Sequence, residues 1–514
     1  MQWAAPTINM EYKLLLALGL SVLFVLLSKV ISFAVKPRLN LPPGPWTLPV
    51  IGSIHHLVRS PNIQRAIRAL SDKHGPLMQI WLGEVPVVVV STVEGAQEIL
   101  KNQDLNFAER HVNSTIAVIS FDATDMFFSP YNERWRQLRK ISMQELLTTA
   151  RVRSFQAIRE QEVARLMRDL AVSADAGAAV NLSSRVGNLV NDIVMLCSVG
   201  SRCRYREEFL EALETAKQQL TWITVADLFP SSKLARMLGN APRTALSSRQ
   251  RMERIIEQII QEHKDDMDSG GDVDAAGKES FVNVLLRLQK EGGTPISITN
   301  ETIVGLLFDI FSGGSETSST TLIWMMVELI RWPRVMAKAQ AEVREALKGK
   351  STITEDDTVG LSCIDMVIKE TLRLHSPVPL LTHSCRETCK VMGYDVLKGT
   401  SVFVNVSAIC RDPRYWEDAE EFKPERFETN NIDFKGSNFE FIPFGSGRRI
   451  CPGINLGLAN MKIVLASLLY HFDWKLPDEM APKDLDVREA PGIVASKLTS
   501  LHICPVTRVA PTSA

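Results

Sequence analysis

A ten-residue loop near the C-terminal end of the chain constrains its structure and chemistry more than any other feature. Residues 444–453 read Phe-Gly-Ser-Gly-Arg-Arg-Ile-Cys-Pro-Gly, and an apolar helical pattern follows over residues 454–470. Glycines let the backbone adopt positive φ and come close to a flat ligand. Cys451 stands at a helix start beside Arg449, where free N–H groups and a cation favour the thiolate. We therefore expect a ligand-binding loop here rather than a loop that buries one structural thiol.

A thiolate in such a loop is suited to haem iron. As an axial ligand it pushes electron density onto the metal and favours cleavage of the O–O bond. Arg449 would face the haem propionates with its fork of N–H donors. The loop therefore predicts a haem–thiolate site with Cys451 as the iron ligand.

The composition is that of a globular protein with balanced charge. Of 514 residues, 45% are hydrophobic and 23% are charged, and 58 Lys and Arg against 59 Asp and Glu leave a net charge of −1. These values exclude a disordered chain, a collagen-like fibre and a polytopic membrane protein. They argue against nucleic acid as a partner, because phosphate binding normally leaves a basic excess. The eight cysteines are widely spread with no CxxC pair, which favours a reducing compartment.

The N-terminal region predicts a membrane anchor. Residues 14–35 are almost entirely apolar, with Lys29 as the one charge, and are long enough to cross a bilayer. Lys36 and Arg38 follow at once, which places the downstream chain in the cytoplasm. A cleaved signal peptide is the alternative, but the apolar run is long and a stiff proline segment follows it. We expect residues 1–38 to be a single-pass anchor and residues 39–52 a proline-rich hinge.

The rest of the chain, residues 53–514, reads as one large domain that is mainly α-helical with small β-sheets. Residues 78–82 and 87–90 have the apolar runs of strands. Amphipathic helical patterns lie at residues 150–172, 207–224 and 247–265, and residues 265–280 read as an exposed loop. We find no internal repeat and no second linker.

A second site is predicted in the helical pattern that contains residues 308–318. Gly313 and Gly314 lie inside this pattern, where each glycine costs about 1 kcal/mol relative to alanine. Such a cost suggests that something packs against the bare backbone. A simple helix kink is the alternative.

An ion pair is predicted upstream of the cysteine loop. Glu370 and Arg373 lie three residues apart, on one helix face within an apolar pattern. A buried ion pair seldom stabilises a fold against a hydrophobic replacement, so its role is geometric. With Arg426 it would hold the helix to the cysteine loop; the alternative is a surface pair of little value.

These motifs together resemble the cytochrome P450 superfamily, in particular its plant microsomal members and the group that oxidises terpenoids. The anchor and hinge are similar to those of microsomal members. Residues 370–373 match the family's Glu-x-x-Arg, and residues 424–427 match the stretch that supplies Arg426. The loop and the residues that contact the haem propionates match at Phe444, Gly447, Arg449, Cys451 and Gly453, and at Trp135 and Arg139.

The resemblance implies a mainly α cytochrome P450 fold and a monooxygenase with haem b (iron protoporphyrin IX). Thr317 would donate a hydrogen bond to iron-bound oxygen, and Glu316 would lie on the proton route from solvent. This pair favours dioxygen chemistry driven by NADPH. Two alternatives stay open: a peroxide-rearranging haem–thiolate enzyme, and a non-catalytic haem-binding membrane protein.

The resemblance also implies the partners and the location. The chain has no Rossmann fingerprint and no flavin motif, so electrons would come from a separate NADPH–cytochrome P450 reductase. Arg134, Arg136, Lys140 and Arg448 could form its basic docking face. The protein would lie in the endoplasmic reticulum membrane with its body on the cytosolic side. The substrate would be hydrophobic, a sesquiterpenoid or diterpenoid held in an apolar pocket.

Two segments depart from the family pattern. After Leu381, similar chains carry a Pro-Arg whose arginine reaches a propionate, whereas this chain is one residue shorter there. His383 and Arg386 are the candidates for replacing that arginine, or one haem contact is missing. Ser407 stands where relatives commonly have Trp, and this exchange would leave a void if the position is buried.

Overall fold

The computed structural model describes residues 39–512 except 59, 61, 201–203, 222–223, 239–240 and 269–279. The anchor expected over residues 1–38 lies outside the described residues, as does most of the loop expected over residues 265–280. Among the helices described, none combines the length and the apolar character needed to cross a membrane.

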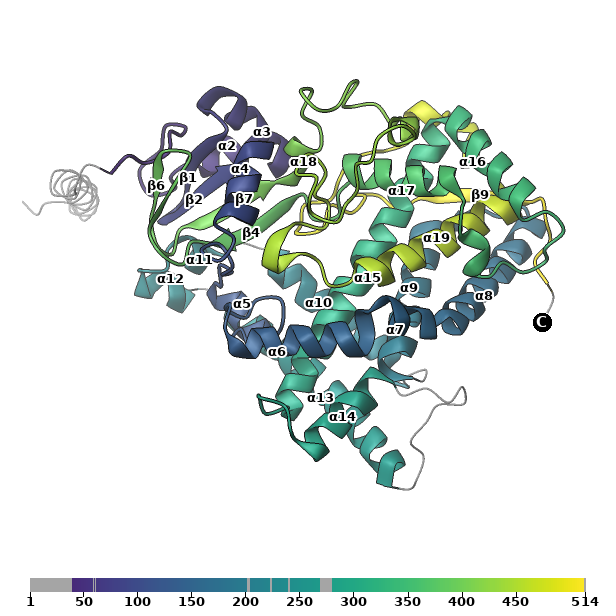
Figure 1. Cartoon of the computed structure of the whole chain (residues 1–514), viewed down its shortest axis with the longest axis horizontal. Helices are drawn as coiled ribbons and strands as arrows, with labels where there is room; N and C mark the ends of the chain where they lie inside the picture. Colours follow the sequence, from purple (N-terminus) through teal and green to yellow (C-terminus); the bar gives the residue numbers. More distant parts are fainter. Residues whose placement is uncertain are drawn as a thin grey trace, which may run out of the picture.

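Helices make up most of the structure, as predicted. The four-stranded sheet lies at one end of the molecule in Figure 1, and the long helices fill the other end. The longer helices are α3 (Ile63–His74), α6 (Glu133–Ser142), α8 (Gln156–Asp175), α9 (Leu182–Val199), α10 (Arg206–Thr221), α13 (Ala241–Asp268), α14 (Phe281–Glu291), α15 (Asn300–Arg331), α16 (Pro333–Ala346), α17 (Ser362–Leu374) and α19 (Ile454–His471). Short helices include α2 (Ile54–Leu57), α4 (Val93–Gln97), α5 (Ser114–Ile119), α7 (Thr149–Ser154), α11 (Val225–Leu228), α12 (Lys233–Leu238) and α18 (Val406–Ile409).

The sheets are small, and the predicted strands belong to the largest one. Its order is β1-β2-β7-β4, with β2 and β7 parallel and the other pairs antiparallel. The strands are β1 (Leu77–Leu82), β2 (Val85–Val90), β4 (Leu380–Ser384) and β7 (Ser401–Asn405). A three-stranded sheet joins β3 (Val180–Asn181), β9 (His502–Thr507) and β8 (Phe472–Lys475), and a hairpin pairs β5 (Cys389–Val391) with β6 (Tyr394–Val396).

All three predicted helices differ from their patterns. The pattern over residues 150–172 is split at Phe155 into α7 and α8. In the pattern over residues 207–224, α10 ends at Thr221, and Thr224 caps the next helix, α11, through a capping box with Asp227. Helix α13 extends beyond both ends of the third pattern.

Helix α15 is the central element of the helical part. Thr299 caps its N-terminus, and it ends before Pro333, which begins α16. Nearly all of its residues on either side of the Gly313 turn are buried. Helices α9, α17 and α19 pack against it, so the segment with two glycines lies in the interior next to the helix that follows the cysteine loop.

Candidate active site

The cysteine loop is a turn closed by its own backbone. The N–H of Cys451 donates to the carbonyl of Phe444 at 2.9 Å, and Gly453 caps α19 directly after it. Gly445 and Gly447 have φ of 73° and 71°, which disfavours a side chain. A Cβ on Gly447 would also lie 2.3 Å from the carbonyl oxygen of Leu100. The loop therefore needs glycine at position 447 for two independent reasons.

The Cys451 thiol lies where burial and a nearby cation act on it in opposite directions. Burial raises its pKa above the ordinary value, and the Gly453 N–H and the Arg139 guanidinium lower it. The cation that acts on this thiol is Arg139. A cysteine that binds a metal does so as the thiolate, so iron would favour the deprotonated form here.

Open space adjoins the central helix, and Cys451 is not fully enclosed. Cys451 is closely surrounded yet keeps part of its surface accessible. Gly313 is exposed in the middle of the buried helix α15, and a Cβ built on it would meet nothing within 4 Å. The two elements touch nearby, since a Cβ on Gly457 of α19 would lie 3.7 Å from the Ser318 hydroxyl.

The two glycines of α15 therefore have different surroundings. A Cβ on Gly314 would come within 3.3 Å of the Val194 side chain on α9, as expected for a glycine that admits close packing. At Gly313 the bare backbone faces open space, and no atom of the described residues packs against it. The Thr317 hydroxyl donates to the Gly313 carbonyl at 2.6 Å, and Glu316, partly exposed, precedes it on the helix.

Trp135 and two arginines are brought together at the cysteine loop. The guanidinium groups of Arg449 and Arg139 lie 4.4 and 5.5 Å from the centre of the Trp135 ring. The Trp135 indole donates to the Met126 carbonyl at 2.8 Å. Arg139 donates to the Ile450 carbonyl, and Arg449 to the carbonyls of Ala108 and Ser129. The predicted propionate contacts thus share one region of the molecule.

Arg110 joins this region, and the sequence reasoning missed it. Its guanidinium is buried and donates to the Thr382 carbonyl, while its Nε has no hydrogen-bond partner among the described residues. Burial, together with repulsion from Arg449 and Arg139, lowers the pKa of Arg110 to about 9. No local pattern marks residue 110, because only the fold brings it next to residue 449.

Neither proposed replacement for the missing arginine supplies a buried cation. The His383 ring is buried and contacts the Phe107 carbonyl at 2.7 Å, and burial and Arg110 lower its pKa to about 3. This ring is therefore neutral. Arg386 is exposed. The additional positive charge comes from Arg110 instead.

These features fit a flat, anionic metal cofactor. One thiol is available as a soft ligand, and open space adjoins the bare backbone of α15. Besides burial, the pKa of Arg110 is lowered by Arg449 and Arg139, and that of Arg449 by Arg139, with Asp125 and Glu109 as the nearby acids. Such a cluster of like charges favours an anion, and the carboxylates of a haem would supply it.

The predicted ion-pair cluster is present and buried. Arg373 makes two hydrogen bonds to Glu370, at 2.8 and 2.9 Å, and Arg426 donates to Glu370 at 3.0 Å. Both arginines lie over the ring of Trp416, whose indole donates to the Glu440 carbonyl. The cluster thus connects α17 to the segment that leads into the cysteine loop.

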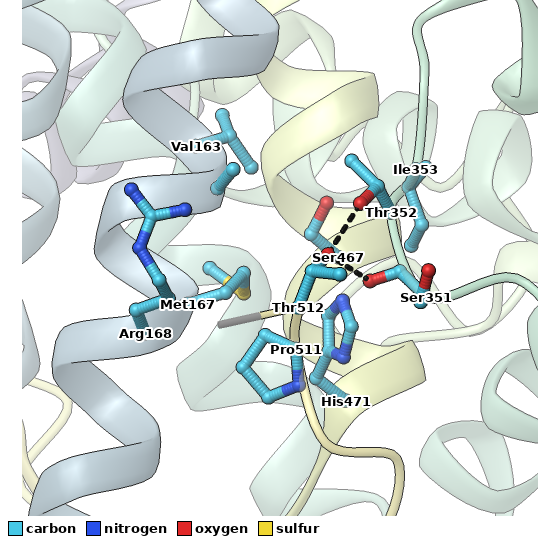
Figure 2. A pocket seen from close by; sticks show the side chains of 11 residues that line it. Val163, Met167, Arg168, Ser351, Thr352, Ile353, Ser467, His471, Pro511 and Thr512 are labelled. Carbon is cyan, nitrogen blue, oxygen red and sulfur yellow. Dashed lines mark hydrogen bonds between the residues drawn. The ribbon is translucent and has the colours of Figure 1, made fainter. Parts of the chain in front are cut away.

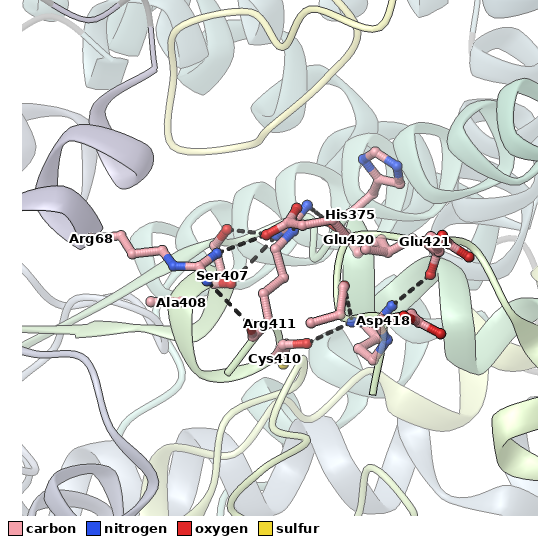
Figure 3. A network of polar contacts seen from close by, with 12 residues as sticks. Arg68, His375, Ser407, Ala408, Cys410, Arg411, Asp418, Glu420 and Glu421 are labelled. Carbon is pink, nitrogen blue, oxygen red and sulfur yellow. Dashed lines mark hydrogen bonds and ion pairs between the residues drawn. The ribbon is translucent and has the colours of Figure 1, made fainter. Parts of the chain in front are cut away.

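Ser407 is part of a polar network and not the lining of an expected void (Figure 3). It is half-buried, and its hydroxyl accepts from Arg411 at 2.7 Å. Arg411 also pairs with Glu420, which Arg68 contacts from α3. The serine therefore accepts a hydrogen bond from the buried Arg411 guanidinium, which lowers the free-energy cost of burying that charge.

Trp135, Arg139, Arg449 and Arg110 together form what we call the clamp region. A basic hollow of about 330 Å³ lies on the surface at this region. It contains three of the four predicted docking residues. Arg134 is not among them, because it turns inward and donates to the Thr302 hydroxyl at the start of α15. The hollow is lined by Tyr131, Trp135, Arg136, Arg139, Lys140, Met143 and Arg448.

A second crevice lies apart from these residues, between α8, the end of α19 and the C-terminal segment (Figure 2). Thr512 closes one side through hydrogen bonds to Thr352 and to the Ser351 carbonyl. None of the predicted site residues lines it, so it is not a candidate for the active site.

Comparison with known proteins defines the class. The family model for cytochrome P450 matches residues 42–502, and the chain belongs to that family. It is an oxidoreductase of the haem-dependent class that the cysteine loop indicates.

Several plant enzymes are similar over nearly the whole chain. An ent-cassadiene hydroxylase of Oryza sativa subsp. japonica is 68% identical, over 98% of this chain and 99% of the relative. An ent-isokaurene C2/C3-hydroxylase of the same plant is 66% identical, over 98% and 100%. A zealexin A1 synthase of Zea mays is 58% identical, again over 98% and 100%.

Proposed function

We propose that this protein is a membrane-anchored monooxygenase that uses haem b and inserts one oxygen atom into a terpenoid hydrocarbon. The observation that carries the proposal is the position of Cys451, which keeps part of its surface accessible and lies near Arg139 of the arginine cluster. Bound haem would supply dioxygen activation at its iron. Cys451 would hold the iron through its sulfur, and Trp135, Arg139, Arg449 and Arg110 would hold the propionates.

The protein's own residues would manage protons and exclude water around that centre. The Thr317 hydroxyl already points to the Gly313 carbonyl, at the turn where open space begins. From there it holds a proton at Oγ1 next to the reacting volume. Glu316 is partly exposed, so its carboxyl can exchange protons with solvent and pass them inward. The buried apolar residues of α15 on both sides keep bulk water away.

The terpenoid assignment rests on the relatives and on the apolar surroundings. The two relatives above 60% identity are named as hydroxylases of ent-cassadiene and ent-isokaurene, and a Zea mays dolabradiene monooxygenase is 58% identical. The compound in each of these enzyme names ends in -ene, the suffix of an olefinic hydrocarbon. Such a ligand is held by shape with few polar contacts. We propose a sesquiterpenoid or diterpenoid of this kind.

Electrons would enter through the basic hollow from NADPH–cytochrome P450 reductase. Arg136, Lys140 and Arg448 line the hollow next to Trp135 and Arg139, so an acidic partner there would lie close to the clamp residues. Charge complementarity of this kind speeds encounter with a partner.

The body would sit on the cytosolic face of the endoplasmic reticulum, tethered by residues 1–38 and tilted by residues 39–52. Large apolar side chains are exposed just after the anchor, including Trp46, Val50 and Val58. Leu234 and Met237 of α12 are exposed as well, at 65% and 82%. Apolar surface of this kind is suited to the membrane interface.

One experiment tests the haem–thiolate assignment directly. Purified protein should show the strongly red-shifted Soret band of a thiolate-bound ferrous–CO haem, and Cys451→Ala should abolish it. Cys363→Ala is the matched control, because Cys363 is a partly exposed free thiol elsewhere in the fold. Haem binding with that band in Cys451→Ala would overturn the assignment.

A second experiment separates the reaction from its alternatives. With reductase and NADPH, a panel of sesquiterpene and diterpene olefins should yield oxygenated products, and Thr317→Ala should lose most turnover while retaining haem. Turnover of fatty hydroperoxides without NADPH would instead identify a peroxide-rearranging enzyme. Haem binding with no turnover in either assay would identify a non-catalytic carrier.

A further inference from the structure

Two acids meet between the central helix and the clamp region, and the proposed reaction does not use them. Asp309 lies on α15, one turn before Gly313, and Asp125 lies in the chain segment that precedes α6. A Cβ built on Gly305, one turn before Asp309, would lie 3.7 Å from both Cα and Cβ of Asp125. Residue 125 therefore packs directly on the face of α15 that carries Asp309.

Both carboxyls bind the backbone of one short segment, residues 125–129, which we call the bridging segment. Asp309 accepts the N–H of Met126 at 2.6 Å. Asp125 accepts the N–H groups of Phe128 and Ser129 at 2.7 and 3.1 Å through Oδ1. The other oxygen of Asp125, Oδ2, is buried without a hydrogen-bond partner among the described residues.

The carbonyls of the same segment accept the clamp side chains. The Met126 carbonyl accepts the Trp135 indole, and the Ser129 carbonyl accepts Arg449. The bridging segment thus binds Asp309 of α15 through an N–H group, and it binds Trp135 and Arg449 through its carbonyls.

Two carboxylates that share one short segment, Asp125 buried and Asp309 half-buried, cannot both be ionised at low cost. Burial and the neighbouring Asp125 raise the pKa of Asp309 well above its usual range, against the N–H groups of Met126 and Phe127. Burial raises the pKa of Asp125 to about 7, although Phe128, Ser129, Arg449 and Arg110 oppose the shift. The other charged groups of this region, Arg139, Glu109 and Tyr131, act on Arg449.

We propose that Asp125 and Asp309 share one proton, and that this singly protonated pair fixes the bridging segment between the distal helix and the haem clamps. The shared proton would satisfy Oδ2 of Asp125, which is buried without a hydrogen-bond partner among the described residues. Neither acid touches the reacting atoms, so both are positioning residues. The effect on haem retention rests on the proposed function, whereas the shared proton itself does not.

Two variants of Asp309 separate proton sharing from simple packing. Asp309→Asn keeps an oxygen that accepts the Met126 N–H and offers an N–H in place of the shared proton. Asp309→Leu has the same branching at Cγ, although it is larger, and leaves the Met126 N–H and the Asp125 charge unsatisfied. In the holoenzyme we expect Asp309→Asn to keep haem like the wild type, and Asp309→Leu to lose it at least about tenfold faster.

Infrared spectroscopy detects the proton directly and does not depend on turnover. At about pH 8, above the folded pKa of Asp125, the wild type should show the C=O stretch of a protonated carboxylic acid, and Asp309→Asn should lack it. Asp365→Asn is the control, because Asp365 is 44% exposed and paired with Lys462. This measurement decides the proposal even if Asp309→Leu does not fold.

The pH dependence of stability gives a third readout. The pKa values of Asp125 and Asp309 are raised in the folded protein. The stability that protonation of these two acids contributes is therefore complete below the ordinary pKa of Asp. It falls as the pH rises towards the folded value, about 7 for Asp125. The unfolding temperature of Asp309→Asn should fall less over that range than those of the wild type and Asp365→Asn.

Equal haem loss in both Asp309 variants, or an unchanged carboxylic-acid band in Asp309→Asn, would overturn the proposal. Failure of the wild type to oxidise any terpenoid would count against the proposed function alone and leave these readouts in place.

Discussion

At the scale of single residues, Arg110 shows how one buried charge can define a site. It contributes a third cation beside Arg139 and Arg449, and its Nε is left without a partner in the described structure. We expect Arg110→Met to preserve folding but to weaken haem retention by about tenfold to a hundredfold, as the loss of a supporting contact does. Haem dissociation measured by transfer to an acceptor protein checks this.

Arg386→Met is the control for Arg110. Arg386 is exposed and near in sequence to the missing Pro-Arg, so its loss should leave haem retention unchanged. If Arg386→Met weakened haem retention as much as Arg110→Met, Arg386 would be the residue that replaces the missing propionate contact.

The adjacent glycines of α15 give a second prediction at this scale. Gly313→Ala should raise the free energy of unfolding by up to about 1 kcal/mol, the difference in helix propensity between glycine and alanine, since no atom of the described residues opposes the new Cβ. The same methyl would enter the open space and lower terpenoid turnover. Thermal unfolding and product formation measure the two effects.

Gly314→Ala provides the contrast, because its Cβ would press on Val194 at 3.3 Å and lose part of the helix gain. A Gly314→Ala variant that is more stable than Gly313→Ala would contradict the tighter packing around Gly314.

At the scale of elements, the cysteine loop depends on backbone geometry that side chains cannot share. Gly445 and Gly447 have nearly the same positive φ, but only at Gly447 would a Cβ meet a backbone oxygen. Gly445→Ala should cost about 1–2 kcal/mol from strain alone. Gly447→Ala should cost more, because the Leu100 carbonyl must also move.

Urea denaturation of both variants measures this difference. Equal costs would mean that the chain near Leu100 yields freely and that the close approach at Gly447 has no structural value.

At the scale of the whole molecule, the predicted orientation has a chemical test. The chain carries four Asn-x-Ser/Thr sequons, at Asn113, Asn181, Asn300 and Asn405. Asn405 is fully buried, whereas Asn300 is exposed at the start of α15. With a cytosolic body, the full chain expressed in a eukaryotic host should carry no glycan, as treatment with a glycosidase and mass spectrometry would show.

A control shows that the exposed sequon is competent. Residues 39–514 behind a secretory signal peptide should gain glycan at Asn300. Glycan on Asn300 in the full chain would contradict the cytosolic orientation.

The sequence by itself determined much of this protein. The spacing of residues 444–453 and of residues 370–373 identified the family, because a thiol loop and an ion pair within a helix are local patterns. The hydrophobic periodicity identified a mainly helical body with a small sheet. The glycines at 445 and 447 marked a turn with positive φ, since that requirement belongs to each residue.

Only the tertiary structure decided the rest, because those properties depend on atoms distant in sequence. Arg110 lies more than 300 residues from Arg449, so no pattern could place both in one charge cluster. Desolvation, which local sequence does not record, lowers the pKa of His383 to about 3 and keeps its ring neutral. The meeting of Asp125 with Asp309 has the same origin, since packing on Gly305 brings a loop carboxyl onto a helix face.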